Sequence, residues 1–209
     1  MQDLATLELI LKILFPIISC IGGTFLIFKG SKAEEIGQQY FFYGIGLFGY
    51  LYALTRIGFL ISDFTRDNAI LFPIFWRLAQ IISLIALLIL VLVLEKYVVK
   101  TKYIFTIICA IGTVLTAVLQ RDVAKIIIII ISVIVLIVIL SIYLYIGKKS
   151  QGAARIKAFK CAISIFMLAA GIFIEGSFGS TLLGFDTGIL GTVIMTIGIG
   201  YYFIINYST

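Results

Sequence analysis

Residues 126–147 read IIIIIISVIVLIVILSIYLYIG, a run with no charge, no Pro, and no Gly before its last position. An α-helix rises about 1.5 Å per residue, so about 20 residues cross the roughly 30 Å hydrocarbon core of a bilayer. We therefore predict a transmembrane helix here. This prediction decides the class of the whole chain, because a bilayer tolerates only helices or closed barrels as spanning structures.

The segment after this run is basic. Lys148, Lys149, Arg155, Lys157 and Lys160 follow within a short distance, and no acidic residue lies among them. Short cytoplasmic loops collect Lys and Arg, so we place this loop on the cytoplasmic side as a topology signal. An alternative role is docking of a cytoplasmic protein, at Lys148, Lys149, Arg155 and Lys157.

Composition agrees with a membrane protein. The chain has 209 residues, of which 62% are hydrophobic and 12% charged, and its mean hydropathy is +1.21. The charged share is about half that of soluble proteins. We expect one membrane domain, residues 1–209, in contact with the lipid bilayer. The net charge of +6 lies mostly in predicted cytoplasmic loops, so it predicts contact with anionic lipid and no nucleic acid partner.

Apolar runs along the chain predict an all-α, polytopic membrane protein, a bundle of seven transmembrane helices. Pro16 falls near the middle of the first helix, where it is expected to kink the span. Pro73 falls in the first turn of the third helix, where Pro is tolerated. The predicted helices cover residues 7–28, 39–61, 72–94, 102–119, 123–147, 155–175 and 181–206.

The basic residues set the predicted orientation. Ten of them fall at the three links predicted to be cytoplasmic, and at most four fall on the opposite side. This asymmetry predicts an N-terminus outside and a C-terminus inside, with the plasma membrane as the expected host. The ten are Lys29, Lys32, Lys96, Lys100, Lys102, Lys148, Lys149, Arg155, Lys157 and Lys160, and the four are Lys12, Arg66, Arg121 and Lys125.

The residue inventory argues against several chemistries. The chain has no His, which removes His ligation of haem or metal and His general bases. Cys20, Cys109 and Cys161 lie in predicted spans and form no CxxC pair, so we interpret them as small buried hydrophobes. No acid or serine has catalytic companions at a suitable spacing. We therefore predict no enzyme activity, no cofactor, and no catalytic or metal-binding residues.

Charges inside the predicted spans indicate a candidate site. Arg56 and Arg77 lie about 8 to 10 Å from the predicted outer ends of their helices, and Asp186 lies about as deep in the last helix. Such charges are costly and usually face the bundle interior or a cavity. We predict an outward-facing polar pocket for a small ligand. Its predicted lining consists of Tyr52, Arg56, Trp76, Arg77, Gln80, Glu175 and Asp186.

A structural role is the alternative for these residues. An Arg side chain is long enough to reach the headgroups from this depth, so Arg56 and Arg77 are also candidates for anchors or ion-pair partners. Asp186 is too short to do the same, and pairing with either arginine would lock two helices together.

Seven spans with an external N-terminus and a short inner tail resemble the rhodopsin-like architecture. Trp76–Arg77 and Asp186 resemble the charged outer halves of microbial rhodopsins. Residues 181–206 contain no Lys for a retinal Schiff base, so this resemblance implies no retinal photochemistry. The stretch 94–106, LEKYVVKTKYIFT, is similar to the link between helices 3 and 4 in archaeal multi-span proteins that resemble sensor regions of histidine kinases. We expect no output domain after the last predicted helix.

Three functions remain open on these grounds. The first is a non-enzymatic sensor or receptor-like module, in which a small molecule bound outside shifts helices that a separate protein reads inside. The second is a small-solute transporter or channel, which would suit a repeat of three helices on each side of a single one, although no repeat is visible. The third is a structural accessory subunit of a larger membrane complex.

Overall fold

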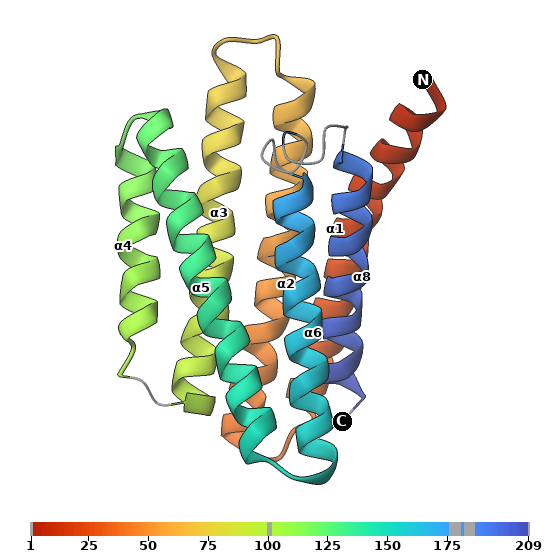
Figure 1. Ribbon diagram of the computed structural model, residues 1–209, viewed down its shortest axis with the longest axis vertical. Coiled ribbons are helices and arrows are strands. Elements are labelled where there is room, and N and C mark those ends of the chain that lie inside the picture. The colour runs from red at the N-terminus through yellow and green to blue at the C-terminus, as the bar shows by residue number, and fades with distance from the viewer. Residues whose placement is uncertain (1, 100–101, 176–180, 182–186, 209) are drawn as a thin grey trace. The chain divides into compact units, whose positions relative to one another are not determined.

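The computed structural model describes residues 2–99, 102–175, 181 and 187–208 (Figure 1). Within these residues all regular structure is helical, which confirms the predicted all-α class. A short π-helix, η1, directly continues α3. The elements are α1 (Gln2–Ser31), α2 (Ile36–Phe64), α3 (Leu71–Leu94), η1 (Glu95–Val99), α4 (Ile104–Val118), α5 (Arg121–Lys149), α6 (Gly152–Glu175) and α8 (Gly188–Tyr207).

Six of these helical segments are long and apolar enough to cross a membrane, which supports an integral membrane protein. They belong to α1, α2, α3 together with η1, α5, α6 and α8. The remaining helix, α4, is apolar but has only 15 residues. At 1.5 Å per residue its length is about 22 Å, shorter than the hydrocarbon core of a typical bilayer.

The ends of α4 explain why it is shorter than predicted. Lys102 and Tyr103 have φ angles of 54° and 62°, in the left-handed region that interrupts a right-handed helix. Leu119 is extended, with ψ 161°. The helix therefore covers Ile104–Val118 in place of the predicted 102–119.

The last helix also begins later than predicted. Thr187, with φ −104° and ψ 5°, precedes α8, and α8 itself begins at Gly188. The helix predicted from residue 181 is therefore interrupted at Thr187. Asp186, which the sequence analysis placed in that helix, lies outside the described residues.

The chain divides into two compact units. Unit 1 consists of Met1–Ser19 and Val138–Thr209, and unit 2 consists of Cys20–Ile137. The boundaries fall inside α1 and α5, so each of these helices contributes residues to both units. The single membrane domain inferred from the sequence stays a prediction.

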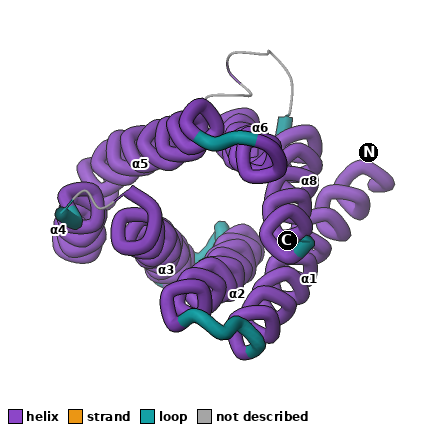
Figure 2. Tube along the Cα trace, turned by 90° about the horizontal axis from the view of Figure 1, so that it is seen from below, coloured by secondary structure: helices purple, strands orange, loops and turns teal. Residues whose placement is uncertain are grey.

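In unit 2, α3 lies between α2 and α4 and packs against both (Figures 1 and 2). Close approach depends on small residues, as is common between membrane helices. A Cβ atom added at Gly44 would lie 2.1 Å from Val93 Cγ2. One added at Gly112 would lie 1.9 Å from Ile131 Cδ1, so α4 packs closely against the first half of α5.

In unit 1, α6 and α8 pack against each other along their length (Figure 2). A Cβ atom at Gly191 would lie 2.4 Å from the Glu175 backbone nitrogen. Near the same end, the Thr187 hydroxyl donates a hydrogen bond to the Ile174 carbonyl. The two helix ends are therefore held by backbone contact and by a hydrogen bond.

Candidate functional site

Both ends of α4 are held by charged side chains from the segment that contains α3 and η1. Arg77 Nη2 donates a hydrogen bond of 3.0 Å to the Leu119 carbonyl, at the C-terminal end of α4. Glu95 accepts hydrogen bonds from the backbone amides of Phe105, at 3.1 Å, and Thr106, at 2.9 Å, at its N-terminal end. The signs match the helix dipole, because a cation is stabilised at the C-terminus and an anion at the N-terminus.

The Arg77 end of α4 is surrounded by aromatic rings and further cations. Arg121, the first residue of α5, places its guanidinium carbon 4.6 Å from the ring centre of Phe72 and 5.2 Å from that of Trp76. The Lys125 ammonium lies 5.7 Å from the Trp76 ring centre. These distances fall within the range of cation–π attraction. We call Phe72, Trp76, Arg77, Arg121 and Lys125 the cation–aromatic cluster.

The charges of this cluster are only weakly compensated. Asp122 is the nearby acid, and its carboxylate lies 3.9 Å from the Lys125 ammonium with a side chain that is 95% exposed. Such an exposed pair contributes little free energy. Arg121 Nε is buried and has no hydrogen-bond partner among the described residues. A buried N–H group without an acceptor is costly.

The Glu95 end of α4 is more enclosed. Glu95 is 1% exposed, although it belongs to a short π-helical turn. The Thr106 hydroxyl also donates to its carboxylate, at 2.5 Å. This carboxylate therefore replaces intrahelical acceptors that the first amides of a helix lack. A buried acid with several donors is expected in a membrane segment, where an unsatisfied charge would be very costly.

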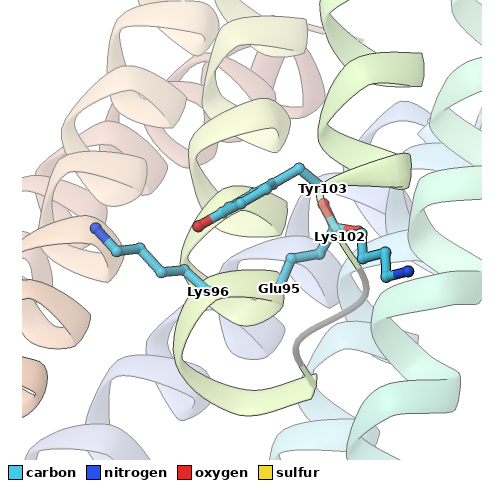
Figure 3. A pocket seen from close by; sticks show the side chains of 4 residues that line it. All are labelled: Glu95, Lys96, Lys102 and Tyr103. Atoms are coloured by element: carbon cyan, nitrogen blue, oxygen red, sulfur yellow. The ribbon is translucent and has the colours of Figure 1, made fainter.

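A hollow of about 300 Å³ lies beside Glu95 and is lined by Glu95, Lys96, Lys102 and Tyr103 (Figure 3). The two lysine side chains extend to opposite sides of Glu95 (Figure 3). Lys96 lies 5.3 Å from the ring centre of Tyr97 and 5.8 Å from that of Tyr40. The lysines therefore do not converge on one ligand position.

The structure brings two of the seven predicted pocket residues, Trp76 and Arg77, into the cation–aromatic cluster. Tyr52 is buried on α2, with its ring stacked against Phe48 at 5.5 Å between centroids. Arg56 on α2 and Gln80 on α3 are half-buried. Arg77 contacts a helix end, so part of its role is the structural one that the sequence analysis held as the alternative.

The other two predicted residues are not part of unit 2. Glu175 belongs to unit 1, where it ends α6 and accepts a hydrogen bond of 3.0 Å from the Thr192 hydroxyl. Asp186 lies outside the described residues. The pocket as originally predicted, with all seven residues around one ligand, therefore stays a prediction.

Three charged residues of importance were not assigned to a site from the sequence. Arg121 was placed in a turn and Glu95 in a link, because both border apolar runs. Arg121 and Lys125 are four residues apart, which puts them on one face at the start of a helix. Trp76 and Arg77 are predicted on the same side of the membrane. The spacing of Arg121 and Lys125, together with this shared side, was the signal that could have identified the cluster. No local signal pairs Glu95 with Thr106, because the chain reverses between them.

Unit 1 contains a separate buried polar group. The hydroxyls of Tyr143 on α5 and Tyr202 on α8 lie 2.7 Å apart. Asn206 Nδ2 donates to the Tyr202 carbonyl at 2.9 Å and lies 3.8 Å from Cys161 Sγ. All four side chains are buried. The group connects α5, α6 and α8, and the sequence analysis did not identify it.

The cation–aromatic cluster of unit 2 gathers Arg and Lys side chains, which are the usual partners of anions. Arg fixes carboxylate and phosphate groups with several N–H donors, and Lys adds a mobile point charge. Among the described residues, no group of three His, Cys, Asp or Glu side chains is placed to hold a metal ion. Comparisons with protein-family models, with curated proteins and with solved structures find no match for this chain.

Proposed function

We propose that this protein is a sensor or receptor-like module of the plasma membrane that binds a small anionic ligand on the outside and has no enzyme activity. The distribution of Lys and Arg supports an N-terminus outside and a C-terminus inside. In this orientation the cation–aromatic cluster lies at the outer end of unit 2. Glu95 then lies at the inner end of the same unit.

We include α4 as a seventh transmembrane helix in this proposal. Its 15 residues are too few for an average bilayer. A short span is accommodated by local thinning of the bilayer or by charged side chains at its ends. Arg77 and Glu95 supply hydrogen-bond partners at both ends, which meets the requirement that backbone polar groups in a membrane be satisfied.

One observation carries the sensor function: the segment Leu71–Val99 contacts α4 at both of its ends. An anion that competes for Arg77 weakens the bond to the Leu119 carbonyl at the outer end. Because α4 is short and is held at both ends, a shift at one end changes the geometry at the Glu95 end. A ligand can shift such an equilibrium only through different affinity for the two arrangements, and the Arg77 bond provides that difference.

The inner readout is assigned to the connection between α5 and α6. This connection is short, since α5 ends at Lys149 and α6 begins at Gly152. Lys149 and Arg155 lie over the rings of Tyr145, at 5.4 Å, and Phe159, at 5.8 Å. A cytoplasmic protein with an acidic surface fits this patch, which includes Lys148 and Lys157.

The test uses Trp76, the only tryptophan in the sequence. The full chain is reconstituted in nanodiscs, and Trp76 emission is recorded while phosphate, sulfate or acetate is added at constant ionic strength. Amide hydrogen exchange of α4 is measured in the same samples. We expect a saturable change in emission together with faster exchange at Phe105 and Thr106.

Two variants sharpen this test. Arg77→Gln should abolish the coupled response, whereas Arg66→Gln should retain it, because Arg66 is exposed on the α2–α3 connection and pairs only loosely with Asp63 at 3.4 Å. If Trp76 responds to an anion while exchange at Phe105 and Thr106 does not change, the protein binds anions without transmitting the event, and the sensor function is wrong.

A further inference from the structure

We infer that the anion held by the cation–aromatic cluster is the phosphate of an anionic phospholipid in the outer leaflet. This inference rests on the proposed function, because it names the ligand class of the same site. It depends on three features of unit 2: weakly compensated donors, an exposed position, and an apolar face next to the donors.

The donors come from the start of α5. The half-buried Arg121 side chain lies over the rings of Phe72 and Trp76, and the Lys125 ammonium is one turn further along α5. The Ala124 amide donates to the Gln120 carbonyl at 2.9 Å. The amides before it are the ones that a helix leaves without an intrahelical acceptor. Phosphate oxygens match such a combination of Arg, Lys and helix N-terminal amides.

The exposed position distinguishes a lipid from a soluble ligand. Sites for small soluble molecules enclose most of the ligand surface, whereas the Lys125 side chain is 45% exposed and the neighbouring Asp122 is 95% exposed. A lipid phosphate needs no enclosing cavity, because its acyl chains already lie in the bilayer. The cluster only has to supply the charge that favours an anionic headgroup over a neutral one.

An apolar face continues from the cluster along α5. Ile126, Ile129 and Val133 are exposed on this part of the helix, and Ile129 follows Lys125 by one helical turn. Acyl chains below a phosphate at Arg121 and Lys125 would lie against these side chains. The aromatic rings of Phe72 and Trp76 hold Arg121 in place, so its donors are pre-organised for the headgroup.

The experiment measures quenching of Trp76 by lipids with brominated acyl chains. The full chain is reconstituted in mixtures of brominated phosphatidylglycerol with ordinary phosphatidylcholine, and in the reverse mixtures. The extent of quenching gives the relative association constant of the two lipids near Trp76. One added charge contact near a membrane surface corresponds to about a fivefold preference. We expect the natural protein to favour the anionic lipid by at least this factor.

Substitutions locate the preference. Arg121→Gln should lower it about fivefold, and Lys125→Gln should lower it to a similar extent. Lys125 is the safer variant, because its exposed side chain is not needed for packing. Arg66→Gln, which removes an exposed cation near the same end of unit 2, should leave the preference unchanged. A preference that persists in both Arg121→Gln and Lys125→Gln would overturn the inference.

Free inorganic phosphate separates this inference from the proposed function. If phosphate changes Trp76 emission but quenching shows no preference between the lipids, the ligand is a soluble anion, and the lipid inference fails while the proposed function stands. If neither phosphate nor the anionic lipid changes Trp76, both fail. If the protein prefers the anionic lipid and millimolar phosphate does not change Trp76 emission, the result supports the inference that the bound anion is a lipid phosphate.

Discussion

Arg77 and Glu95 extend from one continuous helical segment and hold opposite ends of the neighbouring helix α4, the cation at its C-terminal carbonyl and the anion at its N-terminal amides. Each charge therefore has the sign that the α4 dipole stabilises. The same bonds satisfy backbone groups that a short helix would otherwise expose to lipid. Because α4 is bonded at both ends to the same helical segment, we expect α3 and α4 to move together.

The Glu95 clamp is expected to be a large contributor to stability. Glu95→Gln removes the charge and turns one acceptor into a donor that faces the amides of Phe105 and Thr106. The free energy of unfolding should fall by about 1–3 kcal/mol, the typical cost of a broken charge-assisted or unsatisfied hydrogen bond. Thermal unfolding in detergent measures it. Glu34→Gln, at an exposed position, is the matched control, and equal losses in the two variants would contradict the clamp.

The Arg77 bond should protect the other end of α4. Arg77→Met keeps a long apolar side chain but removes the donor to the Leu119 carbonyl. We expect faster amide hydrogen exchange in the last turn of α4, where the Leu119 amide donates to the Leu115 carbonyl at 2.9 Å. The change should correspond to about 1–2 kcal/mol. Unchanged exchange there would show that Arg77 does not hold this helix end.

The α6–α8 contact predicts a sharp difference between two glycines of α8. A Cβ atom at Gly191 would lie 2.4 Å from the Glu175 backbone nitrogen, a contact that no rotamer change relieves. At Gly200 the nearest atom is Ile18 Cγ2, at 3.5 Å, an ordinary contact. Gly191→Ala should therefore destabilise by about 1–3 kcal/mol. Gly200→Ala should be neutral or stabilise slightly, since Ala favours helix. Chemical unfolding of both variants in the same detergent measures the two changes in unfolding free energy. Equal changes would contradict the close α6–α8 contact at Gly191.

The buried tyrosine pair of unit 1 should show strong coupling. Tyr143→Phe or Tyr202→Phe leaves the other hydroxyl buried without its 2.7 Å partner, which should cost about 1–3 kcal/mol. Replacing both residues removes both polar groups, so the double variant should lose little more than either single one. Strict additivity in this double-mutant cycle would mean that the two hydroxyls do not bond in the membrane.

The helices were predictable from the sequence because each apolar run is long enough to be distinguished from its polar flanks. Six of them are confirmed as segments able to span a membrane. The bounds of α4 were not predictable, because they depend on left-handed backbone at Lys102 and Tyr103. Neither residue type favours that conformation. Trp76 and Arg77 were identified because a charge inside an apolar run is conspicuous. Arg121 and Glu95 were missed because a charge at the edge of a run is indistinguishable from a topology signal.

The proposed orientation can be tested by accessibility of introduced cysteines. Asp67, on the α2–α3 connection, and Lys149, at the end of α5, are both exposed, and the basic-residue asymmetry places them on opposite sides. In intact cells a membrane-impermeant maleimide should label Asp67→Cys and should label Lys149→Cys only after lysis. The native Cys109 and Cys161 are buried, and the unsubstituted protein measures any background from Cys20. Labelling of both positions in intact cells, or of Lys149→Cys alone, would reverse or remove the outer assignment of the cation–aromatic cluster, and the sensor proposal would lose its site.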